Sequence, residues 1–192
     1  MRLNGFIFKS QPMKWKVLSS EYITKHPYFT ARKDVCEMPD GKLVPAYFVV
    51  ELPESVCAMA ITLEGEVILV KQYRHPIGEI LFELPGGFVD KGEDSKTAIA
   101  RELLEETGYE FTQIDELGKV AGNPGVLTGY THLFLARGGR KIAAQNLDAN
   151  EQIEIILTPL KTVKEQLKNN EFVQALHVSC MFYAFQKLAI DL

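Results

Sequence analysis

The stretch GFVDKGEDSKTAIARELLEETGY, residues 87–109, decides the fold prediction for this chain. Asp94 or Ser95 can cap the start of a helix, because a short polar side chain accepts hydrogen bonds from the first unpaired backbone N–H groups. Gly108 suits the end of the helix, where a left-handed residue is favoured. The stretch therefore predicts a glycine-rich loop, a helix and a second loop.

Three carboxylates share one face of that helix. Glu102, Glu105 and Glu106 fall at i, i+3 and i+4, where like charges repel by about 0.2–0.5 kcal/mol per pair. Arg101 relieves Glu105 only in part, and a divalent cation would neutralise the rest. Mg²⁺ suits such a site because it prefers hard oxygen ligands, keeps several waters and bridges carboxylates to substrate phosphates. The alternative is a solvated acidic face, which is what most glutamate clusters are.

The whole stretch resembles the signature of the Nudix hydrolases. That signature reads Gly, five residues, Glu, seven residues, Arg-Glu-apolar-x-Glu-Glu-x-Gly and then an aliphatic residue. The matching residues are Gly87, Glu93, Arg101, Glu102, Leu103, Glu105, Glu106 and Gly108. Only Tyr109 departs from it.

The resemblance implies an α/β/α sandwich with a mixed sheet, in which the signature forms a loop–helix–loop. It also implies Mg²⁺ as the cofactor, with Mn²⁺ as a substitute. Glu93 and Arg101 resemble the pair that braces the loop against the helix. By this resemblance the metal ligands are the carbonyl of Gly86 and the carboxylates of Glu102, Glu105 and Glu106.

Residues outside the signature resemble the ADP-ribose pyrophosphatase branch of the family. They are the run 70–74, the run 83–87 and Pro124, which follows Gly108 by sixteen residues. In that branch the residue that matches Arg74 contacts the diphosphate, a role that suits a guanidinium with several donors. The alternative for Arg74 is a surface ion pair.

The branch usually forms a homodimer, and this implies two further expectations. An N-terminal β segment packs across the interface, and an aromatic side chain from it stacks on the adenine of the neighbour's substrate. Tyr28 or Phe29 is the candidate here, with core packing as the competing role.

The catalytic base in this branch is often a glutamate in a loop before a late strand. Glu151 is the first choice and Asp148 the second, while Glu105 or Glu106 could take the role instead. A base must reach the attacking water directly or through one other water.

Two departures from the branch bear on the substrate. Gly129 stands where ADP-ribose enzymes tend to have glutamate, and Asn123 replaces a serine. The predicted strand over 43–50 contains Tyr47 but lacks the arginine usual there. Another nucleoside diphosphate sugar, such as GDP-mannose, therefore remains a serious alternative.

The rest of the chain predicts a mixed α/β protein with two parts, an N-terminal β segment over 1–52 and a Nudix domain over 53–192. Glu64-Gly65 predicts a hairpin turn. Further strands are expected at 80–84, 116–121, 130–136 and 151–157, and helices at 160–169 and 171–189, the last with an apolar stripe of Val178, Met181, Phe185 and Leu188.

Composition limits the function classes. The net charge of −4 provides no basic field for nucleic acid, and no apolar run reaches the roughly 18 residues that span a membrane. Three cysteines without a C-x-x-C pair indicate a reducing, cytoplasmic compartment.

The sequence thus predicts an Mg²⁺-dependent hydrolase that cleaves the diphosphate of ADP-ribose or a related nucleoside diphosphate sugar, giving a nucleoside monophosphate and a sugar phosphate. A hydrolase for a different nucleotide sugar is one rival. A non-catalytic module that binds such a nucleotide is another, but degenerate signatures favour that role and this one is intact.

Overall fold

The computed structural model describes residues 13–26 and 29–191. The described residues form two compact units. One comprises the described residues up to Leu52 together with Asn123–Thr128, and the other comprises Pro53–Gly122 and the described residues from Gly129 onward. Among the described residues no helix has the length and apolar character needed to cross a membrane.

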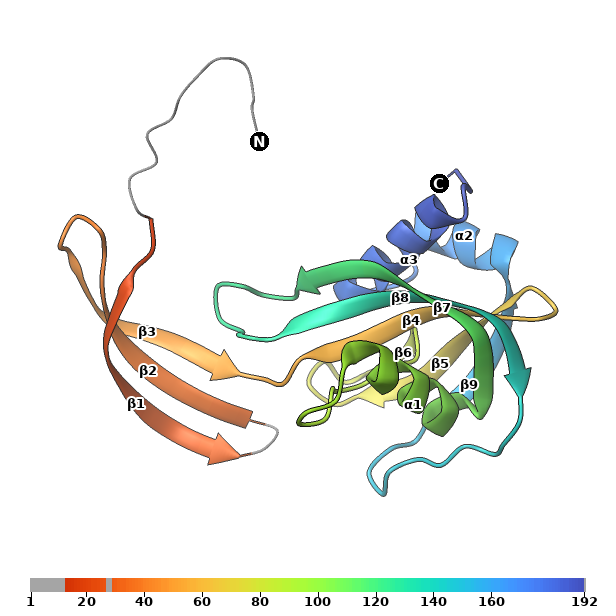
Figure 1. Ribbon diagram of the computed structural model, residues 1–192, viewed down its shortest axis with the longest axis horizontal. Helices are drawn as coiled ribbons and strands as arrows, with labels where there is room; N and C mark the ends of the chain where they lie inside the picture. The colour runs from red at the N-terminus through yellow and green to blue at the C-terminus, as the bar shows by residue number, and fades with distance from the viewer. Residues whose placement is uncertain (1–12, 27–28, 192) are drawn as a thin grey trace, which may run out of the picture. The chain divides into compact units, whose positions relative to one another are not determined.

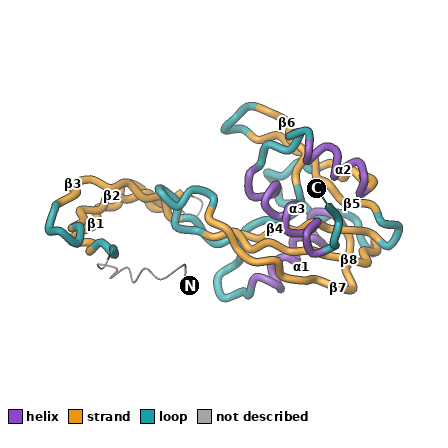
Figure 2. The backbone as a smooth tube through the Cα atoms, turned by 90° about the horizontal axis from the view of Figure 1, so that it is seen from above, coloured by secondary structure: helices purple, strands orange, loops and turns teal. Residues whose placement is uncertain are grey.

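The N-terminal unit is an antiparallel sheet in the order β1-β2-β3. Its strands are β1 (Lys16–His26), β2 (Phe29–Glu37) and β3 (Leu43–Glu51). The segment Asn123–Thr128 joins it by hydrogen bonds, since Val50 donates to the Val126 carbonyl at 2.8 Å and Tyr47 Oη donates to the Gly125 carbonyl at 3.0 Å. Figure 2 shows strands and loops, but no helix, in the described part of this unit.

The second unit is built on a mixed sheet in the order β6-β5-β4-β8-β7, with β9 paired to β5. The β4–β8 pair is parallel and the other pairs are antiparallel. The strands are β4 (Ser55–Thr62), β5 (Glu66–Arg74), β6 (Glu79–Glu83), β7 (Tyr109–Ala121), β8 (Tyr130–Lys141) and β9 (Glu154–Pro159); the helices are α1 (Ser95–Thr107), α2 (Leu160–Lys168) and α3 (Ala175–Lys187).

The central strand β4 separates two hydrophobic cores, because successive side chains of a strand point to opposite faces. Val56, Ala58 and Ala60 pack with Ile99 and Leu103 of α1. The side chains between them pack with α2 and α3 on the other face; they are Cys57, Met59 and Ile61. Figure 1 shows α1 on one side of the sheet and α2 and α3 on the other. The predicted α/β/α sandwich with a mixed sheet and a small N-terminal antiparallel sheet is confirmed.

Several element boundaries differ from those expected. β7 begins at Tyr109, directly after the helix, and pairs with β8 over its whole length. The polar residues along its first half do not predict a strand, because beyond Tyr109 the side chains of this edge strand are exposed or only partly buried. β9 begins at Glu154, and α3 begins at Ala175 with a side-chain cap from Gln174.

Candidate active site

Helix α1 positions the acidic cluster, and its ends are fixed as the sequence predicts. Asp94 Oδ1 accepts hydrogen bonds from the N–H groups of Lys96 and Thr97, both at 3.1 Å. Gly108 adopts the left-handed conformation with φ 72°, and its N–H donates to the Leu104 carbonyl. Because both ends and the buried face of α1 are held, the side chains of its last two turns project in defined directions.

The glycine pair before the signature loop lies between β4 and α1. A Cβ on Gly86 would stand 2.1 Å from the Val56 carbonyl oxygen, and a Cβ on Gly87 would stand 2.5 Å from a carboxylate oxygen of Glu102. The carbonyls of Pro85 and Gly87 accept hydrogen bonds from the backbone of β4. At Gly86 the close neighbours are backbone atoms, so a side chain is excluded there, whereas at Gly87 the neighbour is the end of a side chain.

Glu106 is the buried member of the cluster, with 4% of its surface exposed. Its Oε2 accepts the backbone N–H of Gly86 at 2.8 Å, so the helix and the glycine pair are joined directly. Burial raises the pKa of Glu106 to about 8, and the negative charges of Glu102 and Glu151 add to this rise. The Gly86 N–H and the positive charge of Arg74 oppose it.

Arg101 gathers the other acidic side chains. Its Nε and Nη2 bind the two carboxylate oxygens of Glu93 at 3.1 and 3.0 Å, so the expected brace between loop and helix is present. Its Nη1 donates to Glu102 at 2.9 Å and to Glu105 at 3.0 Å. Its Nη2 also donates to the Phe88 carbonyl, and its Nε lies 4.0 Å from Asp90 Oδ2. The carboxylates of Glu93, Glu102 and Glu105 raise the pKa of the guanidinium, with Glu93 contributing most.

The donor set fits a hard divalent cation in its chemistry. Glu102 and Glu105 already converge on one cationic nitrogen, and burial raises the pKa of Glu102. As the side chains stand, no group of three His, Cys, Asp or Glu within the described ranges is arranged to hold a metal ion. In this arrangement Arg101 engages Glu102 and Glu105, and the Gly86 N–H engages Glu106.

A buried glutamate, Glu83, holds Arg74, and no sequence pattern predicts this role. Arg74 Nε and Nη2 both donate to Oε2 of Glu83, at 2.8 and 2.7 Å, and Gln72 donates to the same oxygen at 2.9 Å. Glu83 is 1% exposed, whereas the Arg74 side chain is 43% exposed. The ion pair therefore anchors the guanidinium edge formed by Nε and Nη2. It does not engage Nη1, which lies on the other side of the guanidinium.

His177 of α3 supports the same region from the other face of the sheet. Its Nδ1 accepts the Leu84 N–H at 3.2 Å, two residues before the glycine pair. Burial, with a smaller contribution from the Arg74 charge, lowers the pKa of His177 to about 3. A neutral imidazole is required for Nδ1 to accept this bond. No sequence pattern predicts this contact, since it joins residues that are 93 positions apart along the chain.

Glu151 and Asp148 lie in the loop 142–153 between β8 and β9. The backbone N–H of Asp148 donates to Oε2 of Glu151 at 3.0 Å, and both residues are exposed. The negative charge of Glu151 contributes to the raised pKa values of Glu102 and Glu106, so its carboxylate lies within electrostatic range of the cluster. Asn146 of the same loop donates its N–H to the Glu105 carbonyl at 2.8 Å, so this loop lies against the end of α1.

The remaining predicted residues belong to the N-terminal unit. Tyr28 lies outside the described residues. Phe29 begins β2, and 52% of its surface is exposed. Pro124 lies in the segment Asn123–Thr128, which packs with the N-terminal sheet. The contribution of these residues to a binding site remains a prediction.

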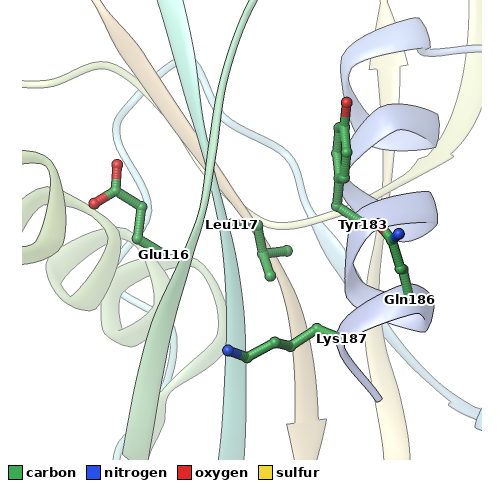
Figure 3. Close-up of a pocket in the computed structure, with 5 residues that line it drawn as sticks. All are labelled: Glu116, Leu117, Tyr183, Gln186 and Lys187. Carbon is green, nitrogen blue, oxygen red and sulfur yellow. The ribbon is translucent and has the colours of Figure 1, made fainter. Parts of the chain in front are cut away.

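A hollow of about 300 Å³ lies elsewhere in the second unit, between β7 and α3 (Figure 3). Its lining residues are Glu116, Leu117, Tyr183, Gln186 and Lys187. None of them is a predicted site residue. Because the hollow lacks converging carboxylates, we place the candidate active site at α1 and the glycine pair.

Comparison with known proteins assigns the family. Residues 51–176 match the NUDIX domain, and residues 15–50 match the nucleoside diphosphate sugar hydrolase N-terminal domain. The chain belongs to the Nudix family. The first match contains the whole acidic cluster, the glycine pair and the loop that carries Glu151.

Several relatives align with this chain over most of their length. The methanol dehydrogenase activator of Bacillus methanolicus is 31% identical over 180 residues, which are 93% of this chain and 94% of the relative. The ADP-ribose pyrophosphatase of Bacillus subtilis is 30% identical over 183 residues, covering 92% and 98%. The mouse (Mus musculus) ADP-sugar pyrophosphatase is 30% identical over 193 residues, covering 92% and 88%.

The fold has a close counterpart among solved structures. The crystal structure of an ADP compounds hydrolase superposes with a TM-score of 0.80 and 23% identity, covering 92% of this chain and 95% of that one. At this identity the similarity supports the fold of this Nudix protein.

Proposed function

We propose that this Nudix protein hydrolyses the diphosphate of ADP-ribose or a related nucleoside diphosphate sugar, and releases a nucleoside monophosphate and a sugar phosphate. The names of the Bacillus subtilis and mouse relatives support the substrate class. The observation that carries the chemistry is the buried Glu106 on the Gly86 N–H, beside two glutamates that share one nitrogen of Arg101. A bound cation would neutralise the negative charge that is concentrated in this cluster.

Nudix hydrolases use divalent metal ions, and the donor set described above fits Mg²⁺, with Mn²⁺ as a substitute. The proposed ligands are the carbonyl of Gly86 and the carboxylates of Glu102, Glu105 and Glu106. When bound, the ion would neutralise charge on the diphosphate and lower the pKa of a coordinated water.

The protein's own groups divide the remaining work. Glu151 accepts the proton of the attacking water, whose oxygen forms a bond to one phosphorus while the bridging P–O bond breaks. The guanidinium of Arg74 binds phosphate oxygens and stabilises the charge that develops on the departing phosphate. Glu105 and Glu106 are alternatives to Glu151 as the base.

The N-terminal sheet supports a proposal about assembly. Several large apolar side chains of β1–β3 are exposed in the single chain, among them Ile23, Leu43 and Phe48. We propose that this sheet contributes to a homodimer and that Tyr28 or Phe29, with Pro124, borders the nucleotide site there. A cytoplasmic location agrees with three free cysteines in the described chain.

A substrate panel tests the proposed function. The purified protein is incubated with Mg²⁺ and ADP-ribose, other ADP-sugars or GDP-mannose, and the products are separated by chromatography. We expect AMP and ribose 5-phosphate from ADP-ribose. Preferential cleavage of GDP-mannose would instead support the rival nucleotide-sugar hydrolase. Tight binding without any product on the whole panel would support a non-catalytic module.

The variant Glu83→Gln tests the role of Arg74. It keeps the shape of the buried side chain but removes the charge that holds Arg74, so we expect kcat/KM to fall by about 10- to 100-fold. The control is Asp115→Asn, which weakens another Arg ion pair, the 2.7 Å contact of Asp115 with Arg137. Steady-state kinetics with the preferred panel substrate should show no loss for this control, and an equal loss in both variants would contradict the assignment.

A further inference from the structure

The loop 142–153 is fastened to the C-terminal end of α1. The N–H groups of Ile142 and Ala143 donate to the Gly108 carbonyl at 2.9 and 3.2 Å, and Asn146 N–H donates to the Glu105 carbonyl at 2.8 Å. The last carbonyls of a helix have no partner within the helix. The loop therefore supplies partners that the end of α1 would otherwise have to find in water.

The side chain of Gln145 joins the end of α1 to the end of the loop. Its Nε2 donates to the Glu106 carbonyl at 2.7 Å and to the Ile153 carbonyl at 3.2 Å. A side-chain amide has two N–H donors, so both are engaged. One acceptor belongs to the helix turn that carries the acidic cluster, and the other lies at the far end of the loop, just before β9. The side chain thus links the two segments that must be held at a fixed distance.

Glu151 lies in the part of the loop between Gln145 and Ile153. It lies two residues before Ile153, and its Oε2 accepts the Asp148 N–H within the loop. The carboxylate itself is exposed and is not bonded to α1, so its place relative to the cluster depends on how the loop is anchored. On the β9 side of Glu151, the bond from Gln145 to the Ile153 carbonyl holds the loop.

We propose that Gln145 is a positioning residue, which holds the loop that carries Glu151 against the end of α1 and so sets the distance between Glu151 and the acidic cluster. This inference rests on the proposed function, in which Glu151 accepts a proton from the attacking water. A base displaced by about 1 Å can lose on the order of a hundredfold in rate. Substrate binding depends on other groups, so KM should change little.

The test is a double-mutant cycle with Gln145→Met and Glu151→Gln. Methionine matches the length of glutamine but has no donors. We expect Gln145→Met to lower kcat by about 10- to 100-fold with KM within about threefold, and Glu151→Gln to lower it by about 100- to 1000-fold. In the Glu151→Gln background, Gln145→Met should cause almost no further loss, because it acts through Glu151.

A second readout does not depend on activity. Amide hydrogen exchange of residues 146–153 should accelerate in Gln145→Met, while exchange in β4 stays unchanged. The matched control is Gln113→Met on β7, where the amide donates only to the Asp115 side chain among the bonds described. This control should change neither kcat nor exchange of the loop. Gln145→Asn, shorter by one methylene, serves as a milder variant and should show a smaller effect in the same direction.

Three outcomes would overturn the inference, and they differ in whether they also contradict the proposed function. Unchanged exchange and kcat in Gln145→Met would show that the side chain does not hold the loop. Losses that multiply in the double variant would show that Gln145 acts independently of Glu151. A fully active Glu151→Gln would remove the base assignment as well, whereas the first two outcomes leave the proposed function intact.

Discussion

Glu106→Gln is expected to lower kcat by about a thousandfold while leaving the fold intact. The substitution removes the charge of the buried carboxylate but keeps an oxygen that can accept the Gly86 N–H, which lies 2.8 Å from Glu106 Oε2. Loss of one group that stabilises charge in the transition state costs on the order of 100- to 1000-fold, and loss of a metal ligand adds to this. Steady-state kinetics across a range of Mg²⁺ concentrations measures the effect.

The same variant should not lose stability. The raised pKa of Glu106 shows that burial disfavours its charged form, and a neutral amide of the same shape has no charged form to bury. The melting temperature without added metal should therefore be equal to or above that of the wild type. Glu110→Gln, on the exposed start of β7, is the control and should leave kcat unchanged. Undiminished Mg²⁺-dependent turnover in Glu106→Gln would remove the metal assignment.

The acidic cluster illustrates how a site of this kind conflicts with stability. Like charges one helical turn apart repel, and burial of Glu106 adds a desolvation cost. Arg101 offsets part of this by binding Glu93, Glu102 and Glu105 together. Natural sequences tolerate such local conflicts mainly where function requires them. The cluster is therefore better explained as a site than as an ordinary solvated helix face.

The parts of the site that the sequence predicts are local. The helix, its Asp94 cap and its Gly108 stop follow from short-range hydrogen bonding, and the spacing of the glutamates follows from the helical repeat. Glu93 and Arg101 are eight residues apart in the sequence, and their contact was expected from the family resemblance. Each of these features depends on neighbours within one loop and one helix.

The parts that the sequence does not predict depend on tertiary contacts. His177 meets Leu84 across 93 positions, and Gln145 meets the Glu106 carbonyl across 39. Neither residue type nor spacing indicates such a partner, since a buried histidine or a loop glutamine has many uses. The association of Asn123–Thr128 with the N-terminal sheet is of the same kind, because it depends on backbone pairing between distant segments.

Replacement of Gly86 by alanine should reduce stability, whereas replacement of the adjacent Gly87 should reduce activity. Gly86→Ala places a Cβ 2.1 Å from the Val56 carbonyl oxygen and 2.7 Å from the Cys57 Cα, and Gly86 has a φ of 152°. Backbone atoms of the central strand β4 cannot move aside without disturbing both cores. We expect the free energy of unfolding to fall by about 3 kcal/mol or more, as measured by denaturant titration.

Gly87→Ala should instead leave the fold stable and impair the site. Its Cβ would lie 2.5 Å from a carboxylate oxygen of Glu102, which is the flexible end of a side chain and can turn away. The free energy of unfolding should change by about 1 kcal/mol or less, because alanine also restricts the unfolded chain. The displaced Glu102 would lose its place beside Arg101 and Glu105, so kcat should fall by about 10- to 100-fold.

The two alanine variants separate structure from chemistry because the substitution is identical and the positions are neighbours. Denaturant titration and steady-state kinetics on both proteins should show a stability loss confined to Gly86→Ala and an activity loss with retained stability in Gly87→Ala. A fully active Gly87→Ala would mean that the position of Glu102 does not matter for turnover. A stable Gly86→Ala would mean that the glycine pair does not pass against β4 as closely as the distances require.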